Sequence, residues 1–153
     1  MKVKDITKII NKNMPILRCA CQIQSWEIEV IYEPLVEVIA TCECNVPYNI
    51  ATITIDPEQH KAECAVLNTL RHECLHIVIS EFDYLYNKMI SIIPMTKNTR
   101  ELLDESYIRA QEVTVGNIER MLDYGLGLSD KKFYKRGSQI TNRYVQGHLR
   151  GNK

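Results

Sequence analysis

Two histidines and a glutamate stand close together in the segment TLRHECLHIV, residues 69–78. His72 and His76 are four positions apart, and Glu73 directly follows the first histidine. Because four residues turn an α-helix by about 400°, both imidazoles would lie on one helix face and could bind one Zn²⁺ at about 2.0–2.1 Å. Glu73 would lie about 100° around the helix, within reach of a metal-bound water. This is the spacing of the HExxH zinc motif, in which the glutamate is the general base.

The residues around the motif favour a metal site over a chance pattern on a buried or surface helix. The positions between and after the histidines include Leu75, Ile77 and Val78, and residues 72–78 contain no proline and no charge besides Glu73. A buried carboxylate without a partner is costly in free energy. A cation bound by neighbouring ligands would remove that cost.

The preferred third ligand is Glu112, on the last predicted helix. It stands between Ile108 and Val115, where the helical period predicts an apolar residue, so its carboxylate should be ion-paired or metal-bound. A solvated helix face is the competing explanation. Four other residues remain as alternative ligands: Glu105, Glu101, His60 and His148.

The segments on either side predict an α+β fold that begins with a helix and a small sheet. Apolar residues recur at helical spacing over residues 2–20, although Pro15 could break this helix. Residues 26–32, 35–46 and 48–56 alternate or are rich in β-branched side chains, which predicts three strands.

Two long helices are predicted after the strands. Asp56 is the predicted N-cap of the motif-bearing helix, with Pro57 at its first position and its apolar period continuing to about Phe82. The last helix is predicted from about Thr99 to Asp123. A single minimal zincin-like domain over residues 1–125 would contain all of these elements, followed by a basic, mobile tail at 126–153.

Net charge and hydropathy give no support for a nucleic-acid-binding or membrane-spanning protein. The formal net charge is zero, so no overall field indicates nucleic acid or a membrane. The chain has no apolar run of about 18 residues and no signal-peptide pattern, and a cytoplasmic protein without a membrane span is expected. The tail from Ser129 carries seven Lys or Arg and one acid. Its KKFYKR segment makes nucleic-acid binding a secondary hypothesis.

At this point the chain resembles the small gluzincin-type (HExxH…E) zinc metallopeptidase-like proteins of bacteriophages and prophages. The resemblance covers about residues 20–122 and is carried by SWEIEVIYE, ATITIDPEQ, LNTLRHECLHIVI and ESYIRAQEVTVGNIERML. It implies zinc ligation by His72, His76 and Glu112, with Glu73 as general base, in a host cell's cytoplasm. Many gluzincins have an acid four residues after the ligating glutamate, a position held here by Gly116.

The resemblance implies a peptidase acting on a peptide or protein. Zinc would lower the pKa of bound water toward about 7 and polarise the scissile carbonyl, and Glu73 would move the proton to the leaving amine. The strand at 50–55 is expected at a sheet edge, where an extended peptide could pair with it. A non-catalytic zinc-binding accessory or interaction protein of the same fold is the alternative. Candidate oxyanion partners are Tyr84, Tyr86, Tyr107 and Arg109.

The six cysteines include two C-x-C pairs, Cys19/Cys21 and Cys42/Cys44. Structural zinc sites usually place two to four residues between paired ligands, which favours separate thiols over a four-thiolate site. Because no export signal is evident, the thiols are expected to be reduced.

We therefore predict that all six cysteines of the cytosolic protein carry free thiols. Trapping with an alkylating reagent during lysis, followed by mass spectrometry, should find six modified cysteines per chain. A reproducible native disulfide would contradict both this prediction and the expected compartment.

Overall fold

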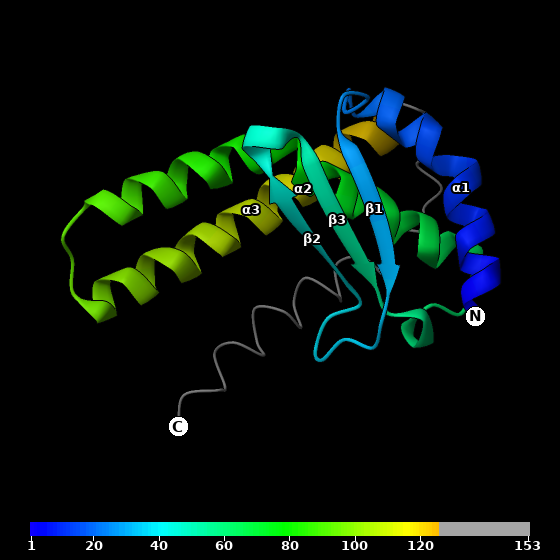
Figure 1. Cartoon of the computed structure of the whole chain (residues 1–153), viewed down its shortest axis with the longest axis horizontal. Coiled ribbons are helices and arrows are strands. Elements are labelled where there is room, and N and C mark those ends of the chain that lie inside the picture. The colour runs from blue at the N-terminus through cyan, green and yellow to red at the C-terminus, as the bar shows by residue number, and fades with distance from the viewer. Residues whose placement is uncertain (126–153) are drawn as a thin grey trace. The chain divides into compact units, whose positions relative to one another are not determined.

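The computed structural model describes residues 1–125, and it has the expected α+β class (Figure 1). The elements are α1 (Val3–Ala20), β1 (Glu27–Tyr32), β2 (Ala40–Asn45), β3 (Ile50–Ile55), α2 (Glu63–Ile92) and α3 (Lys97–Gly125), with short 3₁₀ helices at Val46–Tyr48 and Pro57–Gln59. The chain divides into two compact units, the first ending at Pro94 and the second beginning at Met95. In the described part, no helix is long and apolar enough to cross a membrane. The predicted tail at 126–153 lies outside the described residues.

The sheet of the first unit has the order β1-β3-β2, so β3 is its central strand (Figure 1). It pairs in parallel with β1 and antiparallel with β2. The expectation that residues 50–55 form an edge strand is therefore wrong. The alternation of apolar and polar residues shows which face of a strand is buried. Edge strands and central strands have the same alternation, so the sequence pattern could not distinguish them.

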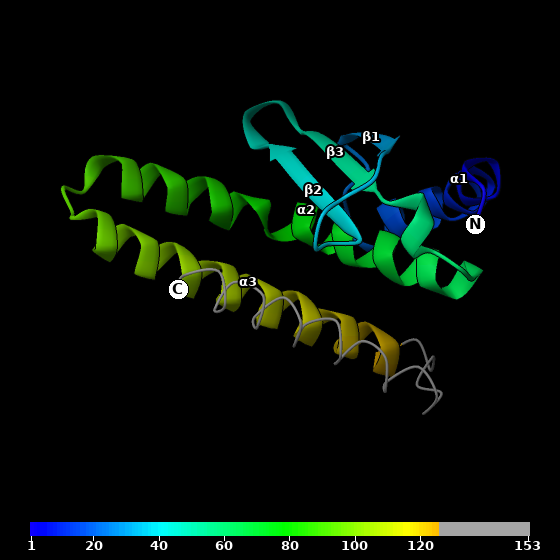
Figure 2. The ribbon, with the colours of Figure 1, turned by 90° about the horizontal axis from the view of Figure 1, so that it is seen from below.

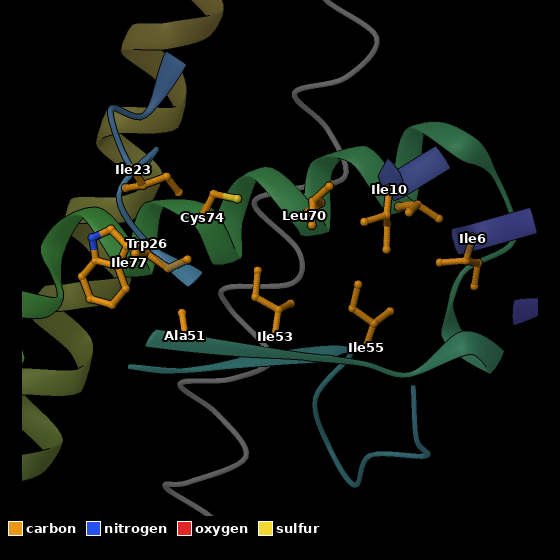
Figure 3. Packing of buried hydrophobic residues seen from close by; sticks show 11 residues of the cluster. Ile6, Ile10, Ile23, Trp26, Ala51, Ile53, Ile55, Leu70, Cys74 and Ile77 are labelled. Carbon is orange, nitrogen blue, oxygen red and sulfur yellow. The ribbon is translucent and has the colours of Figure 1, made fainter. Parts of the chain in front are cut away.

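The hydrophobic core lies between the sheet and two helices of the first unit. The inner face of β3 presents Ala51, Ile53 and Ile55, all fully buried at alternate positions (Figure 3). Above them α2 contributes a row at near-helical spacing and α1 adds two isoleucines. These helical core residues are Val66, Leu70, Cys74, Ile77, Ile6 and Ile10. The sheet covers the first part of α2, which then extends beyond it (Figure 2).

The start of α2 differs from the prediction. Asp56 caps the 3₁₀ helix Pro57–Gln59: its carboxylate accepts hydrogen bonds from the backbone N–H groups of Glu58 (2.9 Å) and Leu35 (3.3 Å). An aspartate that closes such a local turn competes with a continuing helix. The long helix consequently begins later, at Glu63.

Two further boundaries are explained by local backbone conformation. The second predicted strand forms only over β2, because Glu37 has a φ of 68°, in the left-handed region that an extended strand excludes. Pro15 does not break the first helix and lies inside α1. At the end of α1, the Arg18 guanidinium donates to the carbonyls of Gln24 (2.7 Å) and Trp26 (2.6 Å), which ties the helix to the start of β1.

We predict that the central strand is the most sensitive part of the core. Ile53→Ala should lower the free energy of unfolding by about 2–5 kcal/mol, because it removes buried methyl groups and leaves a cavity. Ile50→Ala is the matched control on the same strand, since Ile50 is 39% exposed. Chemical denaturation of both variants measures the difference, and equal losses would contradict the packing of β3 described above.

Candidate metal centre

His72 and His76 form a preorganised pair of nitrogen donors on α2. Their Nε2 atoms are 3.2 Å apart, and their half-buried rings meet edge-to-face with centroids 4.9 Å apart. At the usual Zn–N distance of about 2.0–2.1 Å, that separation corresponds to an N–metal–N angle of about 100–106°. This is close to the tetrahedral value, so the pair fits a zinc ion with little rearrangement.

Glu73 lies on a different side of α2 and is 5% exposed. Its negative charge acts on cysteines of the core face. Burial, followed by the charges of Cys21 and Glu73, raises the pKa of the Cys74 thiol to about 12. Hydrogen bonding to Cys44 and burial raise the pKa of Cys42 most, and Glu73 adds to that rise. The Glu73 carboxylate is therefore buried and influences nearby thiols, although Glu73 directly follows His72 in the sequence.

The described residues contain one group of three or more side chains with metal-ligand geometry, and it consists of His72, His76 and Glu112. Each offers one ligand atom, these atoms lie within 4.8 Å of one another, and all three side chains are half-buried. The group could hold a metal ion. The alternative carboxylates are not part of it: Glu105 is exposed, and Glu101 is exposed and 3.6 Å from the Lys97 ammonium.

The alternative histidine ligands are not brought to this group. His60 is 1% exposed, and both of its ring nitrogens are engaged. Nδ1 donates to the carbonyl of Asp56 (2.7 Å), which leaves Nε2 to accept from the Thr69 hydroxyl (2.9 Å). His60 thus joins the end of β3 to α2 as a structural residue. His148 lies outside the described residues.

The sequence analysis identified the Cys42/Cys44 pair but did not predict that the charge of Glu73 acts on both thiols. Cys42 and Cys44 stand on β2, and their Sγ atoms are 3.7 Å apart. Their signal in the sequence is the i, i+2 spacing, which puts two side chains on one face once the segment is known to be a strand. Among the proposed oxyanion partners, Tyr84 has the Lys88 ammonium 4.6 Å from its ring centroid. The assignment of that role stays a prediction.

No family model, curated protein or solved structure matches this chain. The expected gluzincin family therefore stays a prediction, and the structure supports only a possible metal site at His72, His76 and Glu112.

We predict that Glu112→Gln weakens zinc binding by more than about 100-fold, because loss of a ligand should exceed the roughly 10–100-fold cost of altering a residue that only orients one. Thermal stability measured with zinc present should fall as well, since an ion bound only to the native state stabilises it by mass action. Zinc titration of the metal-free protein measures the affinity.

Glu105→Gln is the matched control on the same helix and should change zinc affinity little. If Glu105→Gln loses the metal while Glu112→Gln keeps it, the assignment of the third ligand is wrong by two helical turns. If both variants keep it, the ion is held by other residues.

Proposed function

We propose that this protein is a zinc-dependent metallopeptidase of zincin-like fold, with His72, His76 and Glu112 as zinc ligands and Glu73 as general base. The observation that carries the proposal is the three-residue group whose ligand atoms lie within 4.8 Å of one another. A glutamate that is nearly buried follows the first of these ligands directly in the chain.

The donor set fits a catalytic zinc site. Two imidazole nitrogens and one carboxylate oxygen are a common three-ligand set for catalytic zinc, and such sites keep one position open. When bound there, zinc acts as a Lewis acid and lowers the pKa of water in its open position. A site with four protein ligands would indicate a structural role instead.

In this proposal Glu73 handles the proton. It is one residue from His72 and therefore rotated by about 100° from the ligand face, which leaves its carboxylate out of the ligand set. An Oε atom of Glu73 takes a proton from the attacking water and delivers it to the nitrogen of the leaving amine. The low exposure of Glu73 limits competition from bulk water for that proton.

The sheet suggests where an extended substrate would pair. Both sides of β3 are occupied by neighbouring strands, so an added strand must use β1 or β2. Of these, β2 packs against α2, the helix that carries the motif. We infer that a substrate peptide adds to the outer edge of β2, where main-chain hydrogen bonds would hold its carbonyl groups in register.

We predict that Glu73→Gln retains zinc and loses peptidase activity by about 10²–10⁴-fold, the usual contribution of a general base. Cleavage of a broad peptide library by the zinc-loaded protein, read by mass spectrometry, measures activity, and elemental analysis measures zinc. Glu63→Gln is the control, because Glu63 is exposed in the first turn of the same helix.

Activity equal to wild type in Glu73→Gln would contradict the assigned role. If wild-type protein with zinc bound at the histidine group cleaves no peptide, the function is that of a non-catalytic zinc-binding protein of the same fold.

A further inference from the structure

The two thiols of β2 form a second pair of metal-binding side chains, separate from the histidines. Cys42 is paired in register with Ile53 and Cys44 with Ala51, and both of these β3 residues are fully buried on the core face. The two cysteines therefore share the face of the sheet that packs on α2. They are half-buried, and their Sγ atoms are 3.7 Å apart.

Strand geometry disfavours a disulfide between these cysteines. Two residues of extended chain span roughly 6.4–6.8 Å, at the upper end of the Cα separations that disulfides tolerate and beyond their usual value of about 5.5–6 Å. The sulfur atoms would also have to approach from 3.7 Å to a bond of about 2.05 Å. Pairing with β3 holds the backbone of β2 extended and resists that movement.

The electrostatic surroundings favour a cation. The hydrogen bond between the two sulfurs lowers the pKa of Cys44 and raises that of Cys42. A contact with the Ser80 hydroxyl further lowers the pKa of Cys44. The charged side chains that act on these sulfurs are acidic: Glu73 acts on both and Asp83 on Cys44.

We propose that Cys42 and Cys44 chelate a thiophilic d¹⁰ cation, such as Zn²⁺ or Cu⁺, at a site distinct from the histidine group. A Zn–S distance of about 2.3 Å and the observed 3.7 Å separation give an S–metal–S angle of about 107°, close to tetrahedral. Soft thiolate ligands select such ions. Both sulfurs bind as thiolates, so binding releases the thiol protons to solvent, and no oxidant or reductant is required.

A metal ion bound at this site should exchange readily with solvent. Within residues 1–125, no third His, Cys, Asp or Glu joins the two sulfurs to form a ligand group. Structural zinc sites are closed by four protein ligands, so a two-thiolate site leaves positions for solvent or for a small thiol to enter. The other C-x-C pair lacks this geometry, because Cys19 lies in the last turns of α1 and two helical positions differ by about 200°.

The test uses Cd²⁺ as a probe on the full-length, reduced and metal-free chain. The wild-type protein should show sulfur-to-cadmium charge-transfer absorption and a ¹¹³Cd resonance typical of two sulfur ligands. The same signals should persist in His72→Ala/His76→Ala, which removes both histidine donors. This arm separates the thiol site from the proposed zinc centre.

Cys42→Ser and Cys44→Ser should each abolish the thiolate signals or weaken cadmium binding by more than about 100-fold. Cys19→Ser and Cys64→Ser are the matched controls, since both residues are exposed, and they should leave the signals unchanged. Because the ¹¹³Cd measurement is made on wild-type protein, it does not depend on the folding of any variant. The proposal is overturned if wild-type protein gives no two-sulfur signal, or if the signal survives in well-folded Cys42→Ser and Cys44→Ser.

Discussion

The packing of α2 on the inner face of β3 is the interaction on which the other features of the first unit depend. Leu70 and Cys74 contribute to the helix row that faces Ile53 across the core (Figure 3). Once that row faces the sheet, the helical rotation of about 100° per residue fixes where every other α2 side chain points. His72 is turned by about 200° from Leu70 and is half-buried, whereas Glu73 stays near the core edge and is almost fully buried.

This rotation gives neighbouring residues different chemical environments. The imidazoles of His72 and His76 meet at their Nε2 atoms, in a geometry that suits a shared cation. Glu73 is rotated by about 100° around the helix from these donors, and its charge contributes to the raised pKa values of Cys42 and Cys74. The same carboxylate makes the surroundings of the β2 thiols favourable to cations.

The position of β3 in the centre of the sheet has a consequence for recognition. Its backbone groups are paired on both sides, and its inner face is filled by core side chains, so it supports the site without offering an edge. The strand β2 is at one end of the sheet order and packs against the helix that carries the histidines. His60 then fixes the connection between β3 and α2 through buried hydrogen bonds to Asp56 and Thr69.

The sequence by itself determined the α+β class, the three strand segments and the helical face shared by His72 and His76, because each follows from a local period of two or 3.6 residues. It also singled out Glu112, since a carboxylate in an apolar stripe violates the local pattern. Only the tertiary structure decided that β3 is central, that Asp56 caps a 3₁₀ helix and that the charge of Glu73 acts on the thiols of Cys42 and Cys44. These features depend on which strands pair and on contacts between segments far apart in the chain, and a local period contains no information about either.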